Sequence, residues 1–169
     1  MPEHVIAMDP GGRSGWASAW MDVNRFQPTG NGVLENTRMA DWLAERQSIV
    51  YARRHPDGWP ADPWYDVVVY ESWRPRRQNG KMDWIENDPL VSAQHVGQIR
   101  WIARASGAQL VEQHPSDKPT AVKTMPEIYA ALNQDSNEQH DQDARMHLWL
   151  YFYRQWLEPG FDPAAAVIL

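Results

Sequence analysis

Two acidic residues stand where the sequence predicts that two strands end. Asp9 closes the mostly apolar run 4–8 and precedes the turn Pro10-Gly11-Gly12, and Glu71 closes the β-branched run 66–70. If these strands lie side by side and parallel, both carboxylates lie in the crevice beyond the strand ends, where open α/β sheets bind ligands. Carboxylate oxygens are the ligands that Mg²⁺ and Mn²⁺ prefer. The sequence therefore predicts a divalent-metal site at Asp9 and Glu71.

A third contribution to this site is expected from the last helix of the chain. His140 and Asp143 stand three residues apart and so share one helix face, whereas Asp141 points elsewhere on the helical wheel. Two Mg²⁺ or Mn²⁺ ions held about 3.5 to 4 Å apart can clamp both the attacking and the leaving oxygen of a phosphodiester. These residue types therefore indicate hydrolysis of a phosphodiester.

A basic and aromatic stretch follows Glu71 directly. Arginine and lysine suit contacts to phosphates, and aromatic rings stack on unpaired bases, so we expect this stretch to bind nucleic acid. Its candidate DNA-binding residues are Trp73, Arg74, Arg76, Arg77 and Lys81. The formal net charge of −6 argues against a general nucleic-acid coat, so binding must rest on local patches of this kind.

The elements that must position these residues follow from the hydrophobic pattern. The expected strands are 4–8, 16–22, 31–36, 66–71 and 109–113. A turn containing proline, glycine and asparagine is expected at 28–32, so the first three strands should form an antiparallel meander. The expected helices are 37–54, 90–105, 126–132 and 138–157, and Gly107 stops the second of them.

Length and composition limit what the chain can be. Its 169 residues fit one domain, 1–169. The absence of cysteine excludes disulfides, thiolate metal sites and a cysteine nucleophile, and it is compatible with a reducing compartment. No segment approaches the roughly 18 apolar residues that span a bilayer, and the first residues lack the pattern of a signal peptide. We expect a cytoplasmic protein that does not enter a membrane.

Taken together, the motifs resemble those of the RuvC-type Holliday junction resolvases, a family of the ribonuclease H-like superfamily. The residues that carry the resemblance are Ile6-Ala7-Met8-Asp9-Pro10-Gly11-Gly12, Val67 to Glu71, and His140-Asp141-Gln142-Asp143-Ala144. Supporting matches are Gly97-Gln98 and Gln113-His114-Pro115, followed by Lys118 and Lys123. The spacing, 62 residues from Asp9 to Glu71 and 72 from Glu71 to Asp143, also fits the family.

The resemblance implies an α/β fold of the ribonuclease H-like type, with a five-stranded mixed sheet, three strands antiparallel and two parallel, flanked by helices. It implies a homodimer that meets a two-fold symmetric four-way DNA junction. The expected activity is that of an endonuclease of DNA recombination and repair, in a phage or bacterial setting. The DNA partner is therefore expected to be branched.

The family's catalytic and metal-binding positions carry over onto Asp9, Glu71, His140 and Asp143. Many members have aspartate where this sequence has His140, while others have histidine, and Asp141 is a candidate to substitute or assist. In the mechanism implied by the resemblance, Asp9 bridges two Mg²⁺ (or Mn²⁺) ions and a metal-activated water attacks the phosphorus in line. The products carry a 5′-phosphate and a 3′-hydroxyl.

Basic and aromatic positions of the family carry over only in part. Lys118 and Lys123 are similar to basic residues that contact the scissile strand. The family also has an aromatic residue three positions after the glutamate, which wedges into the junction. This sequence departs there, with Arg74 at that position and Trp73 one place earlier, so we assign no wedge.

Two other functions share part of this pattern. A ribonuclease H-like nuclease acting on an RNA/DNA hybrid or a flap would keep the same acids, and substrate preference would distinguish it. A non-catalytic DNA-structure-binding protein would keep the basic loop but gain nothing from carboxylates that face phosphate. Taken singly, Asp9 fits a plain turn and Glu71 a solvated strand end. The sequence gives no role to His147.

Overall fold

The structure is a computed structural model, and it describes most of the predicted strands and helices. The described residues are 2–23, 25–35, 38–39, 41–42, 45, 65–72, 77–78, 81–82, 89–125, 139–157 and 167–168. Of the helix predicted at 37–54, residues 38–39, 41–42 and 45 are described and helical. The rest of that helix and the whole of the helix predicted at 126–132 lie outside the described residues.

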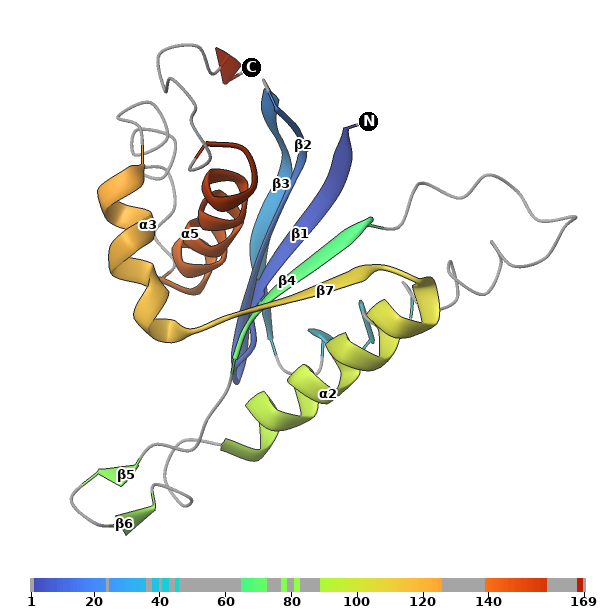
Figure 1. The fold of residues 1–169 in the computed structure, drawn as a ribbon. Helices are drawn as coiled ribbons and strands as arrows, with labels where there is room; N and C mark the ends of the chain where they lie inside the picture. Colours follow the sequence, from blue (N-terminus) through green and yellow to red (C-terminus); the bar gives the residue numbers. More distant parts are fainter. Residues whose placement is uncertain are drawn as a thin grey trace, which may run out of the picture.

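A mixed β-sheet forms the centre of the molecule (Figure 1). β1 (Glu3–Asp9), β2 (Arg13–Asp22) and β3 (Arg25–Glu35) are antiparallel neighbours, as the meander prediction required. β4 (Val67–Glu71) runs parallel to β1, and β7 (Gln109–Gln113) runs parallel to β4. The two-residue strand β8 (Val167–Ile168) adds to the edge at β3 and was not predicted. The five predicted strands and their directions are therefore confirmed.

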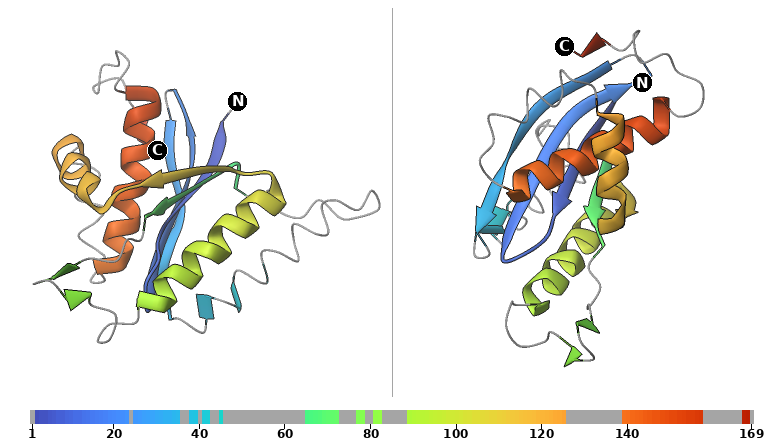
Figure 2. Two further views of the ribbon diagram at one scale, coloured as in Figure 1. Left: turned by 60° about the horizontal axis from the view of Figure 1, so that its bottom comes forward. Right: turned by 90° about the vertical axis from the view of Figure 1, so that its left-hand side faces the viewer.

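The alternation of side chains along the strands creates two hydrophobic cores. Val5 and Ala7 of β1 pack with α5 (Gln139–Phe152) on one face of the sheet. Ile6 and Met8 pack with α2 (Pro89–Ser106) on the other face. Figure 2 shows the two helices on opposite sides of the sheet, with α3 (Lys118–Thr124) beside α5. Both faces of β1 are thus covered, as its apolar composition predicts.

The turn predicted at 28–32 is wrong, because β3 continues through these residues and pairs with β2. A Cβ built at Gly30 or at Gly32 would lie 3.1 Å from an atom of the Trp16 indole. Both glycines therefore provide a flat surface for this ring rather than a turn. Pro28 pairs beside a bulge at Ser18 and Ala19, where a strand tolerates proline.

The helices begin and end near the predicted residues. α2 ends just before Gly107, which adopts φ +78°, a conformation open to glycine without strain. α5 is followed by a π-helical turn, η2 (Tyr153–Leu157). The 3₁₀ turn η1 (Pro115–Asp117) and α3 were not predicted, since they are too short to show a helical period. No helix in the described part of the chain combines the length and apolar composition that crossing a membrane requires.

Candidate active site

Asp9 and Glu71 lie at adjacent carboxyl ends of two parallel strands. Met8 pairs with Tyr70 in the register of β1 and β4, so the residue that follows on each strand is one of the two acids. Both acids stand two residues beyond a core residue on the α5 side, Ala7 and Val69, and therefore share that side of the sheet. The predicted juxtaposition of the two strand ends is confirmed.

The start of α5 brings His140 to Asp9. The two side chains are joined by a contact of 2.8 Å between His140 Nδ1 and Asp9 Oδ2. Gly15, which pairs with Asp9 across β1 and β2, makes this approach possible. A Cβ built at Gly15 would lie only 1.8 Å from the carbonyl oxygen of His140. The absence of a side chain at Gly15 therefore lets the helix start lie against the sheet.

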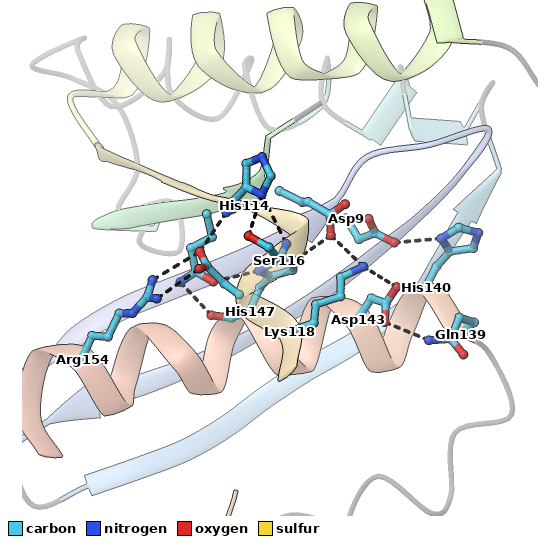
Figure 3. Close-up of polar contacts among 12 residues, drawn as sticks. Asp9, His114, Ser116, Lys118, Gln139, His140, Asp143, His147 and Arg154 are labelled. Carbon is cyan, nitrogen blue, oxygen red and sulfur yellow. Dashed lines mark hydrogen bonds and ion pairs between the residues drawn. The ribbon is translucent and has the colours of Figure 1, made fainter. Parts of the chain in front are cut away.

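Lys118, the first residue of α3, contacts two acids that come from different elements, β4 and α5 (Figure 3). Its Nζ lies 2.7 Å from Glu71 Oε2 and 2.6 Å from Asp143 Oδ2. The other carboxylate oxygen of Asp143 accepts a hydrogen bond of 2.8 Å from Gln139 Nε2. Glu71 of β4 and Asp143 of α5 thus contact one ammonium group, and Asp9 of β1 lies near enough for its charge to act on it.

The electrostatics of the site favour its charged form. Burial disfavours the Glu71 carboxylate, but hydrogen bonds from His147 and Lys118 outweigh it and hold the pKa of Glu71 below its usual value. Burial likewise disfavours the Lys118 ammonium, but Asp143, Glu71 and the charge of Asp9 raise its pKa. The hydrogen bond to Asp9 raises the pKa of His140, and burial opposes it.

His147 is a site residue that the sequence analysis missed. Its side chain is 1% exposed, and its Nε2 lies 2.8 Å from Glu71 Oε2. On the other side of the ring, Nδ1 lies 2.7 Å from Gln113 Oε1, and Gln113 Nε2 donates to the His147 carbonyl oxygen at 3.1 Å. The sequence spacing could have identified His147 as a site residue. It follows Asp143 by four residues and His140 by seven, which places all three on one helix face.

Asp141 does not belong to this convergence. It is buried, and its Oδ2 accepts hydrogen bonds from Arg145 at 2.9 Å and from Asn31 of β3 at 3.1 Å. These contacts tie the start of α5 to β3. The suggestion that Asp141 substitutes for His140 or assists it receives no support from this geometry.

The predicted DNA-binding residues are only partly described. Trp73, Arg74 and Arg76 lie outside the described residues. Arg77 and Lys81 belong to the small hairpin of β5 (Arg77–Gln78) and β6 (Lys81–Met82), which projects beyond the end of the sheet where β1 and β4 finish (Figure 1). Lys118 lies within the acidic cluster and Lys123 is exposed on α3. The cluster and the hairpin are thus found at the same end of the sheet.

The donor chemistry of the cluster fits a divalent metal ion. Asp9 Oδ1 and Glu71 Oε1 receive no hydrogen bond from the described residues, and neither is among the fully buried atoms that lack a partner. These hard oxygen donors are the kind that Mg²⁺ and Mn²⁺ prefer. Among the residues that the structure describes, no three acidic or histidine side chains already stand at the mutual spacing of metal ligands. Lys118 Nζ stands between two of the acids.

Comparison with known proteins shows a structural likeness. No protein-family model matches the sequence, and no curated protein matches it. Thermus thermophilus RuvC in complex with a Holliday junction substrate superposes with a TM-score of 0.59 at 16% identity, covering 90% of this chain and 94% of that one. A second Thermus thermophilus RuvC structure gives 0.58 at 15% identity, covering 89% and 95%. The Fowlpox virus resolvase with Holliday junction DNA gives 0.43 at 12% identity, covering 92% and 95%. The two RuvC superpositions show that the chain has the predicted ribonuclease H-like fold, that of RuvC.

Proposed function

We propose that this chain, built on the fold of RuvC, is a metal-dependent endonuclease that cleaves branched DNA, with the four-way junction as its substrate. One observation supports the proposal above the others. Carboxylates of Asp9, Glu71 and Asp143 converge from β1, β4 and α5 at the carboxyl ends of parallel strands. A cluster of acids facing a polyanion is costly unless cations are bound between them, so it indicates catalysis rather than simple DNA binding.

In this proposal Asp9, Glu71, Asp143 and His140 hold Mg²⁺ or Mn²⁺. Two such ions, when bound, would supply an activated water and stabilise the departing 3′ oxygen, so that the products carry a 5′-phosphate and a 3′-hydroxyl. The protein groups orient the ligands. His140 fixes the carboxylate of Asp9, and buried His147 fixes that of Glu71.

We propose that the DNA contacts are made by a few basic and aromatic residues and not by the whole surface. Arg77 and Lys81 of the β5–β6 hairpin belong to the basic stretch that follows Glu71, and arginine and lysine are residue types that contact phosphates. Trp73, Arg74, Arg76 and exposed Lys123 are further candidates from the sequence. The described part of one chain contains one such acidic cluster, whereas a four-way junction needs two symmetric cuts. We therefore propose a homodimer, in keeping with the two-fold symmetry of the substrate.

The experiment compares cleavage of labelled substrates by the wild type and two matched variants. The substrates are a synthetic four-way junction, the matched duplex, a flap and an RNA/DNA hybrid, each with Mg²⁺, Mn²⁺ or chelator. Asp9→Asn removes a charge from the cluster, and Asp41→Asn removes one from an exposed position as the control. We expect paired junction cuts that need metal, vanish in Asp9→Asn and persist in Asp41→Asn.

Each other outcome would give a different answer. Preferential cutting of the hybrid or flap would keep the active site and change the substrate. Tight junction binding without cutting in either metal would identify a non-catalytic DNA-binding protein and refute the nuclease.

A further inference from the structure

The position of one lysine among the acids has a consequence for how a metal ion enters the site. Lys118 Nζ contacts two carboxylates that come from different elements, Glu71 of β4 and Asp143 of α5. The three side chains are only 23%, 16% and 12% exposed. A half-buried ammonium with two short carboxylate contacts is an internal counter-ion rather than a surface ion pair.

The charge of the cluster explains why a cation is needed there. Three carboxylates gathered at one strand end repel one another, and the repulsion is stronger where water is excluded. Among the described residues, Lys118 is the only lysine or arginine that forms an ion pair with Glu71 or Asp143, and none forms one with Asp9. The imidazoles of His140 and His147 contact Asp9 and Glu71, and the neutral Gln139 amide contacts Asp143. Lys118 is therefore the main permanent counter-charge of the cluster in this structure.

The backbone around Lys118 is held in place while its side chain can move. His114 and Asp117 form a reciprocal cap on η1, and Arg154 of η2 contacts the Asp117 carboxylate at 3.3 Å. Pro119 follows Lys118 and favours the first turn of α3. The lysine side chain itself is a flexible four-carbon chain that ends in a compact charge. Its release from the acids therefore requires rotation about side-chain bonds and not about the backbone.

Resting on the proposed function, we propose that Lys118 is a built-in substitute for the divalent cation, and that metal binding displaces its ammonium from Glu71 and Asp143. The same two oxygens, Glu71 Oε2 and Asp143 Oδ2, attract both cations, so their binding is mutually exclusive at those atoms. Lys118 keeps the acids assembled without metal and lowers the apparent metal affinity by the cost of its release.

Chemical labelling of lysines in the full chain tests this exchange without measuring activity. The sequence has three lysines, Lys81, Lys118 and Lys123, so each reductive methylation product can be assigned by mass spectrometry. In chelator we expect Lys118 to react at least about tenfold more slowly than exposed Lys123, since breaking even one of its two charge-assisted hydrogen bonds costs about one power of ten. Added Mg²⁺ should raise the Lys118 rate about tenfold and leave the Lys123 rate unchanged. A Lys118 rate that Mg²⁺ leaves unchanged or lowers would overturn the exchange.

A second experiment uses two neutral variants of similar length. Lys118→Met should lower the melting temperature in chelator and, by calorimetry, bind Mn²⁺ about tenfold more tightly than the wild type. Lys123→Met removes the same charge from the exposed side of α3 and should change neither quantity. A Lys118→Met protein that binds Mn²⁺ with unchanged or weaker affinity would contradict the exchange.

Junction cleavage by the wild type, measured on the same preparation, separates the two proposals. Metal-dependent cleavage together with unaltered Lys118 labelling would overturn the exchange alone. Absence of cleavage in any metal would overturn the nuclease, while labelling and calorimetry would still decide whether a metal displaces Lys118.

Discussion

Replacing Gly15 by alanine tests how closely α5 must approach the sheet for the site to form. A Cβ at this position would lie 1.8 Å from the carbonyl oxygen of His140, 2.2 Å from its carbonyl carbon and 2.9 Å from the Asp141 nitrogen. All three atoms belong to backbone, so no side chain can rotate away to make room. The start of α5 and strand β2 must therefore separate by more than about 1 Å.

The expected loss follows from that displacement. His140 would move away from Asp9, with which it now makes a contact of 2.8 Å. A misplacement of about 1 Å at an active site can lower the rate about 100-fold, and overpacking of a close contact costs about 1 to 3 kcal/mol of stability. We expect Gly15→Ala to nick a four-way junction about 100-fold more slowly than the wild type, with a lower melting temperature.

The assay is the single-turnover nicking rate at saturating Mg²⁺, well below the melting temperature of the variant, so that lost stability is not counted as lost catalysis. Gly12→Ala is the matched control, since a Cβ at Gly12 meets nothing within 4 Å. A folded Gly15→Ala protein that nicks at the rate of Gly12→Ala would refute the idea that this close approach positions His140.

Three further predictions test the surroundings of the cluster. His147→Leu removes the contact to Glu71 and leaves the buried Gln113 amide without its ring partner, so urea denaturation should show a loss of about 1 to 3 kcal/mol, and calorimetry a weaker affinity for Mn²⁺. Asp141→Asn should lower stability, because Arg145 loses its carboxylate, while the nicking rate per folded molecule stays near that of the wild type; a rate as low as that of an Asp9 variant would instead give Asp141 a catalytic role. Burial disfavours the Asp117 carboxylate, but Arg154 and the His114 N–H outweigh it and hold its pKa below the usual value, so its stabilising effect is present above about pH 4 and lost as the pH falls further. The melting temperature of Asp117→Asn should therefore fall less steeply than that of the wild type as the pH is lowered below about 4. The same pH dependence in both proteins would contradict this.

The parts of the fold that the sequence predicted are those with strong local patterns. The apolar run before Asp9 and the β-branched run before Glu71 are both strands, and their parallel pairing places the two acids together. Gly107 marks the end of α2 because glycine adopts the positive φ found there. These features depend on residues close together in the chain, so pattern alone was sufficient.

The parts that were missed depend on contacts between distant residues. Gly30 and Gly32 predicted a turn, and only the Trp16 ring packed on them explains why they continue a strand. The ion pairs of Lys118 with Glu71 and Asp143, which lie 47 and 25 residues away in the sequence, were not predicted, while its contact with DNA stays a prediction. No local pattern could show that α3 directs this side chain into the cluster.

The alternation that divides the two cores also limits how the sequence of β4 can change in length. Val67, Val69 and Glu71 face α5, while Val68 and Tyr70 face α2. Removing one residue from this strand would turn the Glu71 carboxylate to the α2 side, away from Asp9 and Lys118, even if every pairing to β1 were restored. Removing two would return it to the α5 side with a shorter strand. Single-residue deletions in β4 are therefore expected to abolish the site, and related chains of different length should differ there by even numbers of residues.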